Sequence, residues 1–401
     1  MGFFSGTKNN KEKLALVFYI GSSSVGGALF LMQSSGVPKI LISLREKLPL
    51  RKTLNIDSFA SYTLKALDTV AAKIYKAGLG KPEEVFCILS SPWHVSQTRV
   101  IKLEKNMPFP FTSKLALELI EKEISFFEQE YIKKYQQEAA SMRSIEFKNI
   151  KTMLNGYESS SPIDQKIKEL EMTIFISISP EQFLKKVEEV IGRSFYIKSI
   201  RFSSFNLASF AVVRDMYAHK EDFLLIGIDG EMTDITMVKK NILRESVSFP
   251  LGSNSFTRGI AVLSRLSVNE AESIVSLLKD GHAAGGAEKK FGPALSKLRQ
   301  EWLHKFQESL ANLSNDISVP STIYLIVDKD MANLFSETIK SEQFNQYTLT
   351  ESKFEVVFLD AEVFHGMAAF KEKEVVARDP FIVIGAIYIS RSLVNSPLLK
   401  I

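Results

Sequence analysis

The most regular pattern of apolar and polar positions in the chain lies at residues 223–252, FLLIGIDGEMTDITMVKKNILRESVSFPLG. An apolar run at 223–228 is followed by a polar turn at 229–231 and by an alternating run at 233–238. A second turn at 239–241 precedes a third short run that ends in Pro-Leu-Gly. Apolar runs of this length, joined by turns rich in Gly and Asp, predict the strands of a central sheet.

The first half of the chain opens in the same way. Residues 14–32 form two uncharged apolar runs on either side of the small-residue stretch 21–27, GSSSVGG. Hydropathy alone would indicate a membrane span or a signal sequence here, but glycine and serine at the centre of a span oppose that interpretation. We therefore predict a β-hairpin at 14–32 and a third strand near 40–44.

The remaining elements follow from hydrophobic periodicity and helix caps. Their mixed order predicts an α/β protein with a small α+β module set into its first half. Further strands are predicted at 85–89, 98–103, 168–178, 197–202, 322–327 and 356–359, with a loop or short strand at 154–162. Helices are predicted at 56–77, from Thr112 through a long charged segment 118–150, at 180–191, 206–216, 267–280 and 294–313, from 331, and at 380–390, with a flexible loop at 282–286.

Two turns of small residues occupy equivalent places in the two halves of the chain. Residues 19–25 and 227–233 each join two apolar strands, and each opens one half. Two similar halves would form two lobes with a cleft, across which the two turns face each other. Backbone N–H groups in such turns can cradle phosphate oxygens, although ordinary hairpin turns explain the pattern equally well.

Size and composition narrow the possibilities. The chain has 401 residues, enough for two domains or one bilobed domain, and its 45% hydrophobic and 24% charged residues are typical of a globular protein. A formal net charge of +4 without a block of Lys or Arg argues against nucleic-acid binding. The single cysteine, Cys87, can form no intrachain disulfide, which fits a reducing cytoplasm, and its apolar run is typical of a core residue. The five histidines lack ligand spacing, so no metal site is predicted.

Two segments allow more than one interpretation. Trp93 is either a core anchor or an exposed binding residue. The charged segment 118–150 predicts a solvated helix face, with a partner-binding surface as the alternative. Ser91 and His94, beside Trp93, lack the pattern of a nucleophile elbow, so no catalytic residue is predicted there.

Several short motifs together resemble the actin-like ATPase fold that heat-shock chaperones and sugar kinases share. Within that fold the chain is most similar to the FtsA-type cell-division proteins and the PilM-type type IV pilus proteins. The tail 393–401 lacks the amphipathic membrane helix of the FtsA type and so favours the PilM type. The matching stretches are the first phosphate motif at 20–25, the second at 228–235 and 248–252, Ala271-Glu272, the adenosine motif at 324–326 and 332–334, and FtsA-like segments of the inserted subdomain at 154–162 and 169–171.

The resemblance implies a bilobed fold of two RNase H-like lobes with an inserted small α+β subdomain. The implied parts are a first-lobe core at 1–83, the inserted subdomain at 84–203, and a second-lobe core with the returning closing helix at 204–401. If nucleotide binding is retained, the resemblance implies that the contacting residues are Gly21, Ser22, Ser23, Ser24, Asp229, Gly230, Thr233, Gly252 and Asp328.

The departures from the family pattern oppose that nucleotide chemistry. Tyr19 stands where the family has the Asp that holds the metal's water shell, and a neutral phenol cannot balance Mg²⁺ in the same way. Gly227 stands at the second acidic position, while Asp229 and Glu231 place negative charge in the turn itself. Residues 327–330 replace a Gly-Gly pair that lets the backbone approach the nucleotide. Because phosphoryl transfer depends on positioning and charge neutralisation, we expect little or no ATPase activity and no cofactor.

Two hypotheses of function follow. The first is a cytoplasmic actin-like scaffold or adaptor that links a membrane-associated machine, a divisome or a type IV pilus base, to cytoplasmic partners. Its partners would be proteins, among them a short peptide of a membrane protein and further copies of the chain, and its membrane contact would be indirect. The alternative is a nucleotide-dependent switch or filament-forming ATPase that binds ATP and Mg²⁺, with Asp229, Asp234 or Asp328 taking over the lost roles.

Overall fold

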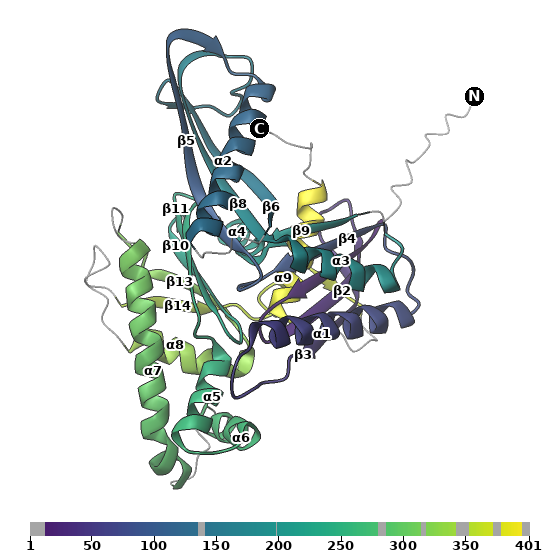
Figure 1. Cartoon of the computed structure of the whole chain (residues 1–401), viewed down its shortest axis with the longest axis vertical. Coiled ribbons are helices and arrows are strands. Elements are labelled where there is room, and N and C mark those ends of the chain that lie inside the picture. The colour runs from purple at the N-terminus through teal and green to yellow at the C-terminus, as the bar shows by residue number, and fades with distance from the viewer. Residues whose placement is uncertain are drawn as a thin grey trace.

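The described residues form a six-stranded, a five-stranded and a four-stranded sheet, packed with helices. Figure 1 shows the first two sheets as two lobes side by side, with the third sheet projecting away from them. The loop and tail predicted around 282–285 and 395–401 lie outside the described residues. The computed structural model describes residues 13–134, 141–197, 199–279, 286–313, 318–341, 353–371 and 378–394.

The first lobe is built on a sheet with the strand order β15-β3-β2-β1-β4-β9. β1 and β2 form the predicted hairpin, and β4 pairs with β1 in parallel. Alternate residues of β1 face opposite sides: Leu16 and Phe18 pack with α1 and α3, whereas Ala15 and Val17 pack with α4 and α9. The bounds are β1 Lys13–Ile20, β2 Ser24–Met32, β3 Lys39–Lys47, β4 Glu84–Leu89, β9 Ile200–Ser204, β15 Ala369–Phe370, α1 Ile56–Lys76, α3 Glu181–Ser194, α4 Phe205–Met216 and α9 Pro380–Val394.

The second lobe repeats this plan with the order β12-β11-β10-β13-β14. β10 and β11 form the second predicted hairpin. One face of the sheet packs against α5, α7 and α8, with Trp302 and Phe306 of α7 at the centre of that core. The bounds are β10 Phe223–Ile228, β11 Thr233–Lys239, β12 Ile242–Phe249, β13 Thr322–Val327, β14 Glu355–Phe358, α5 Ser253–Leu263, α6 Val268–Lys279, α7 Gly286–Leu313 and α8 Ala332–Lys340, with a 3-10 turn at Lys329–Met331.

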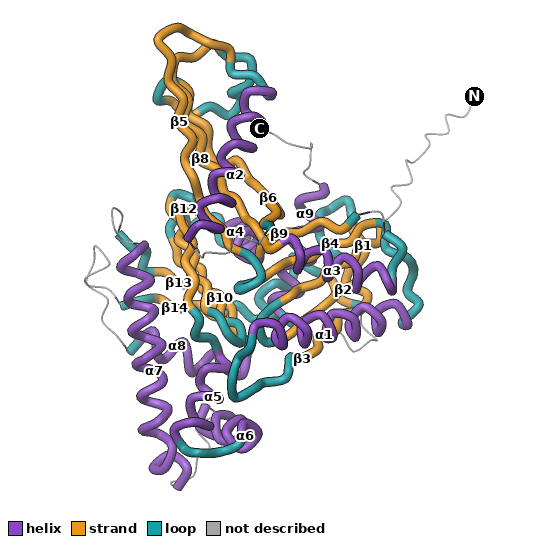
Figure 2. The backbone as a smooth tube through the Cα atoms, viewed as in Figure 1, coloured by secondary structure: helices purple, strands orange, loops and turns teal. Residues whose placement is uncertain are grey.

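The third sheet lies apart, in the order β5-β8-β6-β7, with α2 against one face. Figure 2 shows its long strands extending beyond both lobes. Thr112 caps α2 as predicted, because its hydroxyl accepts the Leu115 backbone N–H at 3.2 Å. The bounds are β5 Val95–Pro110, α2 Ser113–Lys134, β6 Met142–Leu154, β7 Tyr157–Glu158 and β8 Lys166–Pro180.

The long helix predicted through 118–150 is wrong in its second half. α2 ends at Lys134, and residues 142–154 form β6, which pairs antiparallel with β8. The charges obscured this strand, and its ladder with β8 shifts register at Ile145 and at Ile150, which interrupts a regular two-residue period. Ile145 and Phe147 therefore pack against different clusters. The partner surface proposed for a helix over this whole segment therefore has no basis.

The separate sheet is smaller than the predicted inserted subdomain 84–203. β4, at the start of that range, and α3 and β9, at its end, belong to the first lobe, where β4 pairs with both β1 and β9. The sheet of its own comprises β5 to β8, residues 95–180. The bounds 84–203 of the inserted subdomain stay a prediction, and no sequence pattern marks the positions where the pairing partners change.

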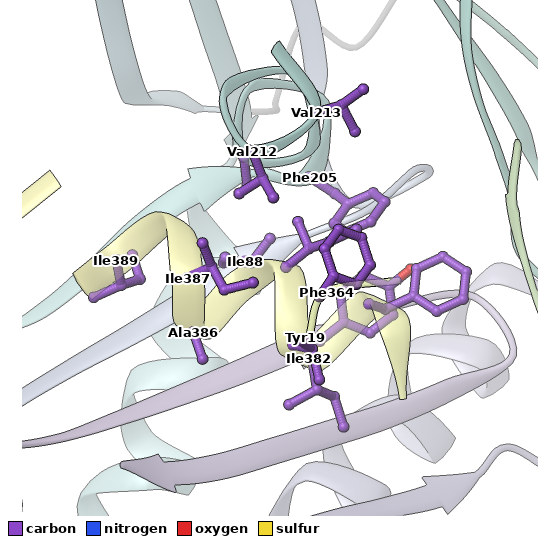
Figure 3. Close-up of a cluster of buried hydrophobic side chains, with 14 of the residues drawn as sticks. Tyr19, Ile88, Phe205, Val212, Val213, Phe364, Ile382, Ala386, Ile387 and Ile389 are labelled. Carbon is purple, nitrogen blue, oxygen red and sulfur yellow. The ribbon is translucent and has the colours of Figure 1, made fainter. Parts of the chain in front are cut away.

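Helix α9 completes the first lobe from the far end of the sequence. Figure 3 shows its residues Ile382, Ala386 and Ile387 in one buried cluster with Tyr19 of β1 and Phe205 of α4. Among the described helices, none combines the length and the apolar character needed to cross a membrane. The apolar segment 14–32 is the hairpin β1–β2 rather than a span.

Candidate functional site

The turn after β1 and the turn after β10 meet between the lobes, with the carboxylate of Asp229 at their junction. Its Oδ2 accepts hydrogen bonds from the Ser22 backbone N–H at 2.7 Å and the Tyr19 hydroxyl at 2.9 Å. Its Oδ1 accepts from the backbone N–H groups of Ser23 at 3.0 Å and Gly230 at 2.7 Å, and from the Ser23 hydroxyl. The two turns face each other as predicted, and a side chain of the second turn joins them.

Glycines at three positions leave no room for a side chain. A Cβ at Gly21 would lie 2.2 Å from Asp229 Oδ2, and a Cβ at Gly230 would lie 2.8 Å from the Cβ of Ser23, so these two glycines allow the two turns to meet. A Cβ at Gly252 would lie 2.2 Å from the carbonyl oxygen of Asp229, so Gly252 allows the start of α5 to pack against the second turn within the second lobe.

The second acid of the turn, Glu231, is neutralised within its own lobe. Its carboxylate accepts Arg258 Nη1 at 3.0 Å and Nη2 at 2.8 Å, and Asn254 Nδ2 at 2.9 Å. Its backbone N–H donates to Ser22 Oγ across the cleft at 2.9 Å. From the sequence we predicted that Glu231 adds negative charge to the turn. The prediction missed Arg258 of α5, which lies against the turn and pairs with that carboxylate.

Arg45 of β3 forms a second contact between the lobes, which the sequence prediction also missed. Its Nη2 donates to Asp328 Oδ2 at 3.1 Å, and its Nη1 lies 2.9 Å from Asp379 Oδ2. Its Nε donates to Ser24 Oγ at 2.7 Å. Burial acts to lower the pKa of Arg45, but the carboxylates of Asp379 and Asp328 outweigh it and raise that pKa above its ordinary value. Asp328 and Ser24, both predicted nucleotide contacts, are thus engaged with Arg45.

Asp234 and Thr233 at the start of β11 are buried. The Asp234 carboxylate accepts the hydroxyls of Ser91 at 2.6 Å and Ser248 at 2.7 Å, and Ser91 belongs to the first lobe. Burial raises the pKa of Asp234 to about 6, although the two hydroxyls oppose that shift. Thr233 donates to the Leu251 carbonyl oxygen at 2.7 Å and accepts Trp302 Nε1 at 3.1 Å, so it supports the turn from within the second lobe.

Trp93 is a core anchor and not an exposed binding residue. It is 7% exposed and stacks between Phe59 and Phe183, with ring centroids at 5.1 and 4.2 Å. Its Nε1 donates to the Gly21 carbonyl oxygen at 3.0 Å, which fixes the first turn. His94 is buried beside it, and burial lowers the pKa of its imidazole to about 4.

The structure brings six predicted residues together at the junction: Gly21, Ser22, Ser23, Asp229, Gly230 and Gly252. The actin-like fold family implies ATP with Mg²⁺ at such a place. In this arrangement a phosphate does not fit, because the backbone N–H groups that would bind it donate to Asp229. Whether any of these residues binds a nucleotide stays a prediction.

A cavity of about 460 Å³ lies elsewhere, between the third sheet and the first lobe. The facing strands are β6 and β9. Among the residues that the structure describes, β6 has no ladder partner on that side before Met153, and β9 is the last strand of the first sheet. The Glu146 carboxylate accepts the Ser204 backbone N–H at 2.8 Å and so ties the two strands together. The cavity is lined by Phe86, Arg143, Ser144, Ile145, Glu188, Ile200, Arg201, Phe202, Ser203, Tyr388, Ile389 and Ser392.

Two sheets of similar plan joined by facing hairpins, with a third inserted sheet, define the bilobed actin-like ATPase fold, and comparison with solved structures agrees. A structure described as a PilM–PilN type IV pilus biogenesis complex matches 94% of this chain and 97% of its own, with a TM-score of 0.61 and 15% identity. At that identity the likeness is one of fold.

Two further solved structures are more distant. The ethanolamine utilization protein EutJ from Carboxydothermus hydrogenoformans has a TM-score of 0.42 and 11% identity over 94% of this chain and 88% of its own. A Bacteroides thetaiotaomicron protein with an actin-like ATPase fold and unknown function has a TM-score of 0.36 and 10% identity over 89% and 94%. No protein-family model and no curated protein matches the sequence.

Proposed function

We propose that the protein is an actin-like adaptor that binds an extended segment of a partner protein and serves the base of a type IV pilus. The likeness to the solved PilM–PilN complex over nearly the whole chain supports the pilus assignment. In that role the protein would sit in the cytoplasm, reach the membrane through its partner, and hydrolyse little or no ATP. The engagement of the junction amides by Asp229 supports the last point.

The cavity between β6 and β9 is the observation that carries the proposal. Both strands have an edge without a ladder partner toward the cavity, and an extended segment can add to such an edge by main-chain hydrogen bonds. The lining residues of both strands precede the Glu146–Ser204 contact, so the contact closes one end of the cavity.

The charges around the cavity are already paired. Arg143 lies 2.8 Å from Glu188, and Arg201 lies 3.0 Å from Glu84. Each guanidinium also lies over a phenylalanine ring, at 5.5 Å for Arg143 and 5.3 Å for Arg201. The partner segment therefore needs no matching charge, and its binding would depend mainly on main-chain hydrogen bonds to the strand edges.

Fluorescence polarisation with labelled peptides tests this site. The peptides are the cytoplasmic segments of the membrane proteins encoded beside this chain, together with segments of division proteins. Ser392 lines the cavity and is exposed. Because a tryptophan side chain there would block the cavity, Ser392→Trp should lower the affinity for the peptide by about 30-fold or more, a loss of the size seen at interface hot spots. Ser160→Trp, at an exposed residue of the loop that follows β7, should bind like the wild type.

Unchanged affinity of the Ser392→Trp variant would remove the cavity from the proposal. Binding of a division segment and of no pilus segment would refute the pilus role. A saturable rise of the melting temperature with Mg·ATP in the wild type would favour the nucleotide-dependent switch instead.

A further inference from the structure

The junction between the lobes is an anion site built from both halves of the chain. Three backbone N–H groups converge on it, from Ser22 and Ser23 in the first lobe and from Gly230 in the second. Two hydroxyls, of Tyr19 and Ser23, complete the set. Converging backbone N–H groups in consecutive turn residues form concave sites that bind oxyanions.

The anion in this site is a side chain of the protein itself. All five groups donate to the carboxylate of Asp229, and Asp229 is only 4% exposed. A carboxylate and a phosphate present the same acceptor oxygens to such donors, and charge-assisted bonds of this kind are among the stronger hydrogen bonds in proteins. Four of the five donors come from the first lobe, so these bonds also connect the lobes.

We propose that Asp229 is an internal ligand: its carboxylate occupies an oxyanion site shared by the two lobes, holds the lobes closed without any bound molecule, and, when removed, leaves a site that takes a phosphate-type oxyanion from solution. The close contact at Gly230 supports this reading, because a Cβ there would lie 2.8 Å from the Cβ of Ser23 in the first turn. The inference does not depend on the partner cavity, and either can fail without the other.

Thermal unfolding with inorganic pyrophosphate tests the site. Each titration is matched with sodium chloride at equal ionic strength. Asp229→Ala should melt below the wild type, and pyrophosphate should raise its melting temperature saturably, by about 2 °C or more at a hundredfold excess over the dissociation constant. The wild type should show no saturable rise, because its own carboxylate occupies the site.

Asp234→Ala is the matched control. It removes another buried acid of the same interface, which accepts the Ser91 and Ser248 hydroxyls. Pyrophosphate should not stabilise this variant. Equal stabilisation of the wild type and Asp229→Ala, or none in a folded Asp229→Ala, would overturn the proposal.

A distance measurement tests the closing role even if Asp229→Ala does not fold. Spin labels at Lys65→Cys in α1 and Glu272→Cys in α6 report the separation of the lobes, and both positions are exposed. Cys87 is buried and will not be labelled. Asp229→Asn keeps the size of the side chain but replaces the carboxylate, and it should broaden the distance distribution relative to the wild type. An identical distribution in both proteins would refute the closing role.

Discussion

The two turns that meet between the lobes occupy the same place in each half of the fold but carry opposite chemistry. The first turn, residues 21–24, offers backbone N–H groups and hydroxyls, and Ser22 and Ser23 are its donors. The second turn, residues 229–232, contributes the carboxylate acceptor Asp229, and its Glu231 backbone N–H donates to Ser22 Oγ. In a pair of turns that binds a separate anion, both sides would donate. Here one turn has become complementary to the other.

Because of this difference, the two turns bind each other directly. The hydrogen bonds that Asp229 accepts, and the one that the Glu231 backbone N–H donates, join residues more than 200 positions apart in sequence. The stability of the closed arrangement therefore depends on residues of both turns, and mutations on either side should lower it.

The largest expected effect is that of Gly252→Ala, which should destabilise the protein by about 3 kcal/mol. The new Cβ would lie 2.2 Å from the Asp229 carbonyl oxygen and 2.4 Å from that of Gly230, and neither backbone atom can move aside cheaply. Urea unfolding followed by circular dichroism measures the loss.

Gly192→Ala in α3 is the control for that measurement. A Cβ at Gly192 would meet nothing within 4 Å, so alanine should stabilise the helix by roughly 0.5–1 kcal/mol. If Gly252→Ala were as stable as the wild type, the backbone contact between the start of α5 and the second turn would not exist in solution.

The second effect concerns Asp234 and pH. Its folded pKa is about 6, above the unfolded value of about 3.8, so the folded state binds the proton more tightly and the wild type loses stability as pH rises from about 4 to 6. Asp234→Asn has no carboxyl group at this position and does not lose stability in this way. The difference in free energy of unfolding between Asp234→Asn and the wild type should therefore shift in favour of the variant by about 2 kcal/mol from pH 4 to pH 7.

Chemical unfolding of both proteins at the two pH values gives the difference. The buried His94 titrates in the same window with the opposite sign, because its pKa is lowered to about 4, but it is present in both proteins and cancels. A difference that does not change with pH would show that Asp234 is not desolvated.

The smallest effect is that of Tyr19→Phe, which should cost about 1 kcal/mol. Burial, and then the charge of Asp229, raise the pKa of the Tyr19 hydroxyl well above its ordinary value, so the group stays a donor to Asp229. Tyr157→Phe, at an 80% exposed position, should have no measurable effect. A loss equal in the two variants would show that the Tyr19–Asp229 bond contributes nothing.

The sequence predicted the parts of this molecule that depend on local pattern. The hairpins at β1–β2 and β10–β11 and the helices α1 and α9 follow from apolar periodicity and turn residues, which act over a few positions. The similarity of the two halves predicted that the two turns face each other across a cleft. It could not show that Asp229 reaches across to the first turn, because that contact depends on the distance between two lobes.

The residues that the sequence missed are those whose roles depend on partners far along the chain. Arg45 is one charged residue in a strand of ordinary composition, and its partners Asp328 and Asp379 lie in other elements. Arg258 and Ser91 are similar cases. β6 was missed for another reason. Its charged residues continue the composition of the preceding helix and hide the pattern of a strand.

Helix α9 has a consequence for how the protein is made. Residues 380–394 cover the face of the first sheet formed by β1 and β2, and a Cβ at Gly26 would lie 2.4 Å from Ile382. On the ribosome, that apolar face is synthesised early but receives its cover only after the whole second lobe has emerged. We therefore expect nascent chains, and any truncation before residue 380, to depend on chaperones and to aggregate without them.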